Sequence, residues 1–530
     1  MVNRAVDPQS PAEQLTDAER TYPDRLDARL LRIAGVCVIA TVMSILDTTV
    51  VSVAQRTFIA QFDSTQAVVA WTMTGYTLAL ATVIPLTGWA ADRLGTKRLF
   101  MGSVLAFTAG SLLCAAAPNI ASLIGFRVLQ GLAGGMLMPL GFTILTHEAG
   151  PKRLGRLMAV LSVPMLLGPI CGPILGGWLI GSYGWEWIFG INLPIGIIAF
   201  VLAAVVFPKD RPSPSETFDF VGMLLLSPGL ATFLYGVSSL PARGTLTDRH
   251  VWIPAAIGAA LTCGFVVHSL HRADHPLINL RLFSNRVFTL ANSAMFVYGV
   301  AFFGAGLLFP SYLQQVLHQT PYQSGVHMIP QSLGAMLTMP LAGTFMDKRG
   351  PGKAVLVGIT LIAAGMGTFA YGAWQRTGYQ PTLLAGLVIL GLGMGSVMTP
   401  LSGSAMQALN PHQIARGSTL ISVNFQVAGS VGTALMSVIL TNQFNRSPNI
   451  SAFNQLTARE STAARHGTRL DPSAIPPRAL APDFTTTVVH ELSRAYTVVF
   501  AVAFALVLAT YIPAAFLPRK PVTSSSAPQR

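Results

Sequence analysis

Apolar runs of about twenty residues follow one another from Leu31 to Leu517, and they constrain this chain more than any other feature. Each run is long enough for one helix to cross the hydrocarbon core of a bilayer. Charged residues make up only 10% of the chain, which is too few to coat several soluble domains. The sequence therefore predicts an all-α membrane protein. It excludes a soluble enzyme, a nucleic-acid-binding protein and a disordered scaffold.

The apolar runs predict fourteen transmembrane helices. The expected spans are 32–54, 67–90, 98–117, 119–146, 156–180, 186–207, 218–240, 251–271, 287–314, 323–345, 353–374, 381–408, 415–441 and 495–517. An even number of spans places both chain ends on one side of the membrane. The segment before the first span has no apolar core of its own, so we expect no cleavable signal peptide.

The basic residues predict which side that is. Of the 34 Lys and Arg residues, 23 fall on the side of the chain ends and 10 on the other side, and six of those ten lie in the long loop 442–494. Basic residues in short loops mark the cytoplasmic side, whereas long loops carry little weight. We therefore expect a multi-pass protein of the cytoplasmic (inner) membrane with both termini in the cytoplasm. The net charge of +13 then reflects topology and not a nucleic-acid partner.

An internal repeat divides the helices into two sets of six with two extra helices between them. The pattern G-x-x-x-D-[RK]-x-G occurs at 88–95 and again at 343–350, and a glycine-rich stretch at 131–135 is echoed at 391–395. Two related halves with a site between them are typical of secondary transporters. The expected division is a cytoplasmic tail at 1–31, an N-terminal six-helix bundle at 32–207, two extra helices and linkers at 208–286, a C-terminal six-helix bundle at 287–517 with an irregular external loop at 442–494, and a second cytoplasmic tail at 518–530.

Asp47 and Arg127 are the ionisable residues expected deep inside the spans. A charge at mid-helix costs about 2.5–3.5 kcal/mol, so it normally faces a cavity or a partner. Both residues are expected roughly 12 Å below the external face, where they could meet. Burial favours the neutral carboxyl group and a nearby guanidinium favours the ionised one, which makes Asp47 the candidate proton site and Arg127 its regulator. A static ion pair that pins two helices is the alternative.

Four polar residues near this pair are candidates for lining a substrate cavity: Thr48, Tyr76, Gln130 and Asn192. Gln130 follows Arg127 by three residues, so the two share a helix face. In the fifth expected helix, small residues recur every four positions and predict a groove for close helix packing, with kinks at prolines. The residues of this stretch are Pro164, Gly168, Pro169, Gly172, Pro173, Gly176 and Gly177.

These motifs resemble the major facilitator superfamily, and specifically its fourteen-helix drug:proton antiporters of the EmrB/QacA type. The resembling segments are a first-helix motif at 46–54, a cytoplasmic loop motif at 88–98, a fourth-helix arginine motif at 127–131, an antiporter signature at 164–177 and a sixth-helix stretch at 185–196. The resemblance covers about 31–440 and the last helix. It departs from the family pattern at Ser52, Gln55, Arg56, Glu186 and Phe425.

The resemblance implies export by alternating access, in which a toxic compound leaves in exchange for protons. It assigns conformational gating to the loop-motif residues Gly88, Asp92, Arg93, Gly95 and Lys97. Protons are the expected coupling ion, with no other cofactor, no metal and no catalytic residue. The chain carries no G-x-x-x-x-G-K-[ST] phosphate-binding loop, so we do not expect ATP to drive transport.

The expected partners are the lipid bilayer and hydrophobic or cationic small molecules. An exporter of an endogenous metabolite, lipid or siderophore is the alternative function, and the sequence does not separate it from a multidrug exporter. A non-transporting membrane sensor is disfavoured, because Asp47, Arg127 and the glycine- and proline-rich seam are all present. No external adaptor protein follows from the sequence.

Overall fold

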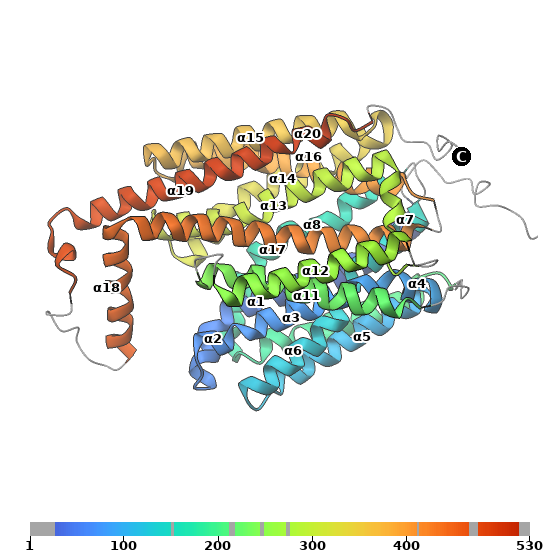
Figure 1. Cartoon of the computed structure of the whole chain (residues 1–530), viewed down its shortest axis with the longest axis horizontal. Coiled ribbons are helices and arrows are strands. Elements are labelled where there is room, and N and C mark those ends of the chain that lie inside the picture. Colours follow the sequence, from blue (N-terminus) through green and yellow to red (C-terminus); the bar gives the residue numbers. More distant parts are fainter. Residues whose placement is uncertain are drawn as a thin grey trace, which may run out of the picture.

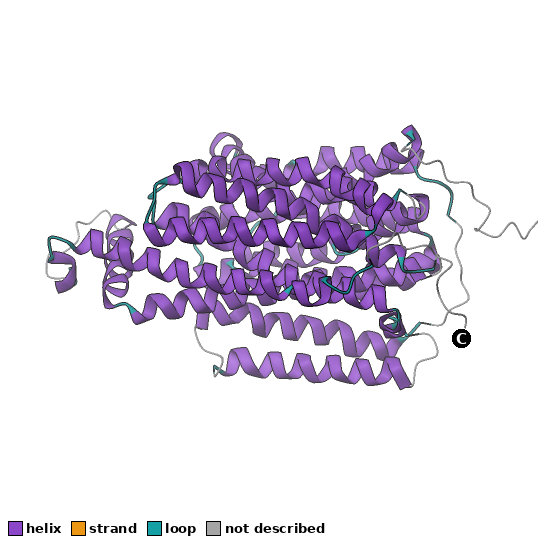
Figure 2. Ribbon diagram, turned by 90° about the horizontal axis from the view of Figure 1, so that it is seen from above, coloured by secondary structure: helices purple, strands orange, loops and turns teal. Residues whose placement is uncertain are grey.

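A computed structural model describes residues 27–149, 153–210, 218–243, 248–271, 276–410, 413–465 and 475–518. In these ranges the regular structure is helical throughout, and the long helices run side by side in one bundle with their loops gathered at its two ends (Figures 1 and 2). Helices occupy all fourteen places where the sequence predicts a span. The all-α prediction is therefore confirmed for the described residues.

The N-terminal half comprises α1 (Ala28–Gln61), α2 (Gln66–Val69), α3 (Trp71–Val83), η3 (Ile84–Leu86), α4 (Thr87–Leu94), α5 (Thr96–Ala115), α6 (Ile120–Gly134), α7 (Leu137–Ala149), α8 (Leu154–Tyr183), α9 (Trp187–Gly190) and α10 (Asn192–Val206). The two extra helices are α11 (Phe220–Arg243) and α12 (Arg249–His271). Figure 1 shows this pair across the front of the bundle, where α11 packs on α3 of one half and on α17 of the other.

The C-terminal half comprises η4 (Leu280–Ser284), α13 (Arg286–Gln315), α14 (Pro321–Arg349), α15 (Pro351–Gln375), η5 (Tyr379–Leu383), α16 (Leu384–Gln407), α17 (Ile414–Arg446), α18 (Pro448–Arg465), η8 (Pro477–Leu480), α19 (Phe484–Ala509) and α20 (Tyr511–Ala514). The two copies of the repeated motif end α4 and α14 in the same way. Gly95 and Gly350 close these helices with φ angles of 90° and 85°, a backbone conformation that favours glycine.

Eleven helical segments of the described chain are long and apolar enough to cross a membrane. The three other expected spans coincide with α8, α14 and the run from α2 to α4. That run is interrupted at η3, where Pro85 lacks the backbone N–H that a continuous helix would use. The count of fourteen spans therefore stays a prediction.

Both ends of the described chain lie at the same end of the bundle, which we call the terminal end; the opposite end is the far end. Asp27 pairs with Arg153 beside the start of α8 at 3.5 Å. The Pro518 carbonyl accepts a hydrogen bond of 3.0 Å from the N–H of Gly352 at the start of α15. This arrangement agrees with an even number of crossings.

The expectation of an irregular segment at 442–494 is wrong for its described part. At the far end α17 runs on to Arg446, α18 then lies across the bundle axis, and α19 begins at Phe484 (Figure 1). Glu491 of α19 anchors the junction, because it accepts hydrogen bonds from Ser447 and from Asn449, the latter at 3.0 Å. Pro448 is the first residue of α18, a position at which proline is well tolerated.

Candidate substrate and proton site

Asp47 of α1 and Arg127 of α6 form a fully buried ion pair. Nη1 of Arg127 lies 2.5 Å from Oδ2 of Asp47, and the two residues are 0% and 1% exposed. The meeting expected from their depths in the spans is confirmed. Taking two charges out of water costs several kcal/mol per ion, so such a pair needs further hydrogen bonds.

Neighbouring amides supply those bonds. Gln130 Nε2 and Asn192 Nδ2 each donate to Oδ1 of Asp47 at 2.9 Å, and Arg127 Nη1 also donates to Oε1 of Gln130 at 2.7 Å. The hydroxyl oxygen of Ser111 accepts from the same two amides, at 2.6 and 2.9 Å. These five buried residues form the carboxylate cluster. The sequence argument missed Ser111.

Arg127 also contacts a backbone carbonyl and aromatic rings, and one of its nitrogens has no hydrogen-bond partner among the described residues. Its Nε donates to the Thr72 carbonyl at 3.1 Å, and its guanidinium carbon lies 4.0 Å from the centre of the Tyr76 ring. Nη2 is buried and has no hydrogen-bond partner among the described residues. The guanidinium is therefore held by one carboxylate, one amide, one backbone carbonyl and the rings of Tyr76 and Phe189, the latter at 5.8 Å, with part of its bonding capacity unused.

A cavity of about 980 Å³ lies beside the carboxylate cluster and is lined by helices of both halves. Within the described part of the chain, no Asp, Glu, Lys, Arg or His contributes to its lining. Methionine and aromatic side chains form much of its wall in the C-terminal half, as suits a pocket for varied apolar molecules. Leu234 and Ser238 also line it, so the extra helix α11 forms part of the wall.

Only two of the four expected cavity residues lie at the cavity. Thr48 and Tyr76 line it, whereas Gln130 and Asn192 do not. The expectation is wrong for the latter two, because their amides turn to the Asp47 carboxylate and are 0% and 1% exposed. The shared helix face with Arg127 placed Gln130 near the pair, but it did not show whether that face meets a cavity or a neighbouring helix.

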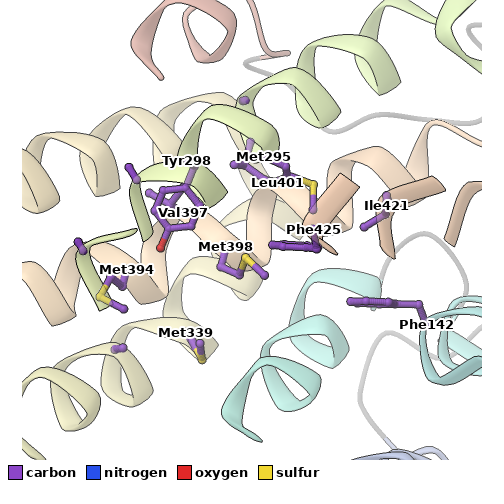
Figure 3. Packing of buried hydrophobic residues seen from close by; sticks show 14 of the residues in the cluster. Phe142, Met295, Tyr298, Met339, Met394, Val397, Met398, Leu401, Ile421 and Phe425 are labelled. Atoms are coloured by element: carbon purple, nitrogen blue, oxygen red, sulfur yellow. The ribbon is translucent and has the colours of Figure 1, made fainter. Parts of the chain in front are cut away.

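The lining of the cavity reaches the far-end parts of α13 and α14, and buried side chains lie beside it. Figure 3 shows Met394, Met398 and Phe425 packed beside one another, with Phe142 of α7 further along towards Ile421. Met394 and Phe425 line the cavity, whereas Phe142 and Ile421 are buried and do not line it. In the opposite direction the lining continues to residues 314 and 324, near the last residue of α13 and the first turn of α14.

Two ion pairs join the halves at the terminal end. Asp92 of the first repeat lies 4.0 Å from Arg416 of α17, and Asp347 of the second repeat lies 3.3 Å from Arg156 of α8. Each repeat therefore reaches an arginine in the opposite half. Gly88 allows this approach, because a Cβ there would lie 3.1 Å from the Thr419 hydroxyl.

The remaining loop-motif residues act within their own half. The backbone N–H of Lys97 donates to Asp210 at 2.8 Å, and its ammonium group donates to two carbonyls at the end of α10. A Cβ at Gly95 would collide with Asp210. Arg93 is exposed and lies 5.9 Å from the Trp89 ring. The expected gating role for this motif stays a prediction, and the geometry gives Gly88 and Asp92 the contacts between halves.

The family model of the major facilitator superfamily matches residues 37–433. The chain belongs to the major facilitator superfamily. The fold class and family predicted from the sequence are thereby confirmed, and the protein is a multi-span membrane transporter and not an enzyme. Residues 37–433 include the carboxylate cluster and both terminal-end ion pairs.

Relatives of this superfamily member cover between 76% and 98% of its length. It is 64% identical over 521 residues to the multidrug resistance protein B homolog of Mycobacterium tuberculosis, covering 98% of this chain and 96% of that protein. It is 30% identical over 412 residues to the multidrug export protein EmrB of Escherichia coli, covering 76% and 79%. The crystal structure of the human organic anion transporter MFSD10 matches 90% of this chain and 99% of that one, with a TM-score of 0.55 and 15% identity, which supports the fold alone.

The glycine seam of this facilitator packs α8 closely on α1, as the four-residue spacing predicts. A Cβ at Gly168 would lie 2.1 Å from Cγ2 of Ile45, and one at Gly172 would lie 2.1 Å from the hydroxyl of Thr49. Gly176 faces the same helix, with 3.1 Å to the nearest atom. The side chains of Pro164, Pro169 and Pro173 fall outside the described part of the structure, so the expected kinks stay a prediction.

We expect Gly172→Val to destabilise the transporter and to abolish efflux. The added atoms would force α1 and α8 apart, and overpacking of this kind costs about 1–3 kcal/mol. Gly177→Val is the matched control on the same helix, because Gly177 is exposed and has no atom within 4 Å of an added Cβ. Melting temperatures and efflux rates of both purified variants test the seam. Wild-type behaviour of Gly172→Val would contradict it.

Proposed function

We propose that this transporter exports hydrophobic and lipophilic cationic small molecules across the cytoplasmic membrane by exchanging them for protons. The observation that carries the proposal is the Asp47 carboxylate, buried at mid-helix and adjacent to a large cavity without charged walls among the described residues. A carboxylate inside a membrane protein marks an ion or proton pathway by default. The printed names of the relatives, multidrug resistance and multidrug export, agree with this class of substrate.

The excess of basic residues in short loops supports a cytoplasmic location for the terminal end. With that orientation, we infer that the cavity opens outward and that the two ion pairs between the halves lie on the cytoplasmic side. In this structure Arg127 is paired with the Asp47 carboxylate. This is the state expected after a substrate has left and before a proton has bound.

Proton entry can supply the required work. Moving one charge through 100 mV releases about 2.3 kcal/mol. Since about 1.4 kcal/mol corresponds to a tenfold ratio, one proton sustains roughly a 50-fold gradient of a neutral solute. The protein needs only to keep the carboxylate ionised when substrate is bound and to let it take up a proton when the cavity is empty.

Export of an endogenous metabolite, lipid or siderophore is the second candidate function. The same cavity favours it, because a volume of about 980 Å³ with apolar walls fits such molecules as well as drugs. A strain that lacks the transporter separates the two functions. Drug hypersensitivity supports multidrug export, whereas loss of one compound from the culture medium with unchanged drug susceptibility supports the second candidate.

Reconstitution tests the proposed function directly. In liposomes with an imposed proton gradient, the wild-type protein is expected to move tetraphenylphosphonium against its own gradient. Movement should stop when the proton gradient is dissipated. Identical fluxes with and without the proton gradient would contradict proton coupling.

We expect Asp92→Asn to insert normally and to slow transport. Its pair with Arg416 is partly buried, because the Asp92 side chain is 32% exposed and the Arg416 side chain 12%. A pair that contributes about 1 kcal/mol to the free energy of the state with a closed cytoplasmic side changes the population of that state about fivefold. Burial raises the pKa of Asp92, while Arg416 opposes the rise, so acidification should weaken the pair at a higher pH than for an exposed carboxylate.

A double variant and a control define this gate further. Asp347→Asn removes the second pair, and Asp92→Asn with Asp347→Asn should slow transport more than either change alone. Arg98→Gln is the control, because Arg98 is a neighbouring, 79% exposed base that pairs within its own half. Wild-type efflux rates in the double variant would show that these pairs do not hold the gate.

A further inference from the structure

Tyr76 is in contact with both the cavity and the carboxylate cluster. Of the groups that the described structure places on Arg127, namely Asp47, Gln130, Thr72 and the rings of Tyr76 and Phe189, Tyr76 alone lines the cavity. Asp47 itself does not line it. A substrate in the cavity therefore meets the Tyr76 side chain and not the proton site.

The ring of Tyr76 contacts Arg127, and its hydroxyl lies beside the hydroxyls of Ser44 and Thr48. The ring centre lies 4.0 Å from the guanidinium carbon, within the range of a strong cation–π contact in a desolvated site. The hydroxyl lies 3.3 Å from the Ser44 hydroxyl, longer than an ordinary O–H···O hydrogen bond. The side chain is 1% exposed, and Gly134 leaves room for its hydroxyl, because a Cβ there would lie 3.1 Å from it.

We propose that Tyr76 is the positioning residue that links occupation of the cavity to protonation of Asp47. This inference rests on the proposed proton exchange. With substrate in the cavity, Tyr76 cannot turn into it, so its ring keeps Arg127 on Asp47. A substrate that enters while Asp47 is protonated therefore returns Arg127 to the carboxylate, and the proton leaves to water. With the cavity empty, the ring can turn inward and the guanidinium follows it, which frees the Asp47 carboxylate to accept a proton.

The surroundings of Arg127 allow such a movement. Nη2 has no hydrogen-bond partner among the described residues, so a shift of the guanidinium breaks no bond at that nitrogen. The groups that face Asp47 from the other elements are neutral: Gln130 on α6, Asn192 on α10 and Ser111 next to both amides on α5. When Arg127 withdraws, these groups leave no positive charge on the carboxylate. Substrate and proton thus exclude each other without sharing a site.

Substrate-induced proton release tests this link. Purified protein in weakly buffered detergent solution is titrated with tetraphenylphosphonium while a pH dye records released protons and tryptophan quenching records binding. Tyr76→Met replaces the ring with an apolar chain. Because Tyr76 lines the cavity, we expect the variant to bind the probe with an altered dissociation constant, which the quenching measures, and to release no protons even at saturating probe. Tyr76→Phe keeps the ring and should keep proton release.

Tyr298→Met is the matched control, because Tyr298 is also a buried tyrosine of the cavity wall but lies on α13 in the other half. We expect this variant to change probe affinity and to keep proton release. Wild-type proton release by Tyr76→Met, or equal loss in Tyr76→Phe and Tyr76→Met, would overturn the role of the ring. If the Met variant does not fold, loss of release in Tyr76→Phe alone overturns it. Absence of release from the wild-type protein would instead contradict the proposed proton exchange.

Discussion

Asp47→Asn is expected to reduce uphill efflux to the level of liposomes that lack the protein. Asparagine keeps the shape of the side chain and one acceptor oxygen for Arg127, but it cannot bind and release a proton at working pH. Exchange of labelled for unlabelled tetraphenylphosphonium needs no proton and should continue. The pair of measurements therefore separates a coupling defect from a folding defect. Normal uphill efflux by the variant would place the proton site elsewhere.

Removal of one charge from a buried ion pair is also expected to lower the free energy of unfolding. Arg127 would remain buried opposite a neutral amide, at a cost of about 3–5 kcal/mol. The double variant Asp47→Asn with Arg127→Gln removes both charges and serves as the control. We expect it to recover the melting temperature of the wild-type protein and to remain uncoupled.

Arg127→Ala is expected to abolish coupling, and Arg127→Lys to impair it less. Lysine keeps the positive charge beside Asp47 but lacks the planar fork that reaches Asp47, Gln130 and the Thr72 carbonyl together. In Arg127→Ala no positive charge favours the ionised carboxylate, so Asp47 should keep its proton whether or not substrate is bound. Efflux rates against an imposed drug gradient test this order. Near-normal rates in both variants would reduce Arg127 to a residue of helix packing.

The meeting of Asp47 and Arg127 could be predicted because two simple quantities define it. Helix rise gives the depth of each residue in its span, and the alternation of spans gives its direction. The cost of a lone charge in the membrane then requires a partner. The glycine seam was predictable for a similar reason, because a spacing of four residues places Gly168 and Gly172 on one face of α8.

Contacts between distant helices could not be predicted in the same way. Arg416 and Arg156 were counted only as topology-setting charges, and nothing local to them indicates that they pair with Asp92 and Asp347 across the two halves. Ser111 gave no signal, since a neutral hydroxyl in an apolar helix is common and inexpensive. Its importance arises only from the two amides that α6 and α10 bring to it.

The position of Tyr76 shows that helix packing determines whether a residue lines the cavity or joins the buried hydrogen-bond network. The sequence grouped Tyr76 with Gln130 and Asn192, whereas the structure separates them by function as well as by place. The two amides hold the carboxylate, and the tyrosine ring divides the carboxylate cluster from the cavity. Gly131 lets α6 pack closely on α3 beside this residue, because a Cβ there would lie 2.5 Å from the Tyr76 carbonyl oxygen.

Drug-driven proton movement is the measurement that tests the central claim most directly. Liposomes that contain an internal pH dye and the purified transporter, with no initial pH gradient, are given tetraphenylphosphonium on one side only. If Asp47 is the proton site, the wild-type protein will move protons against the direction of drug flow, and Asp47→Asn will move drug without protons. Proton movement by Asp47→Asn at the wild-type rate would contradict the account.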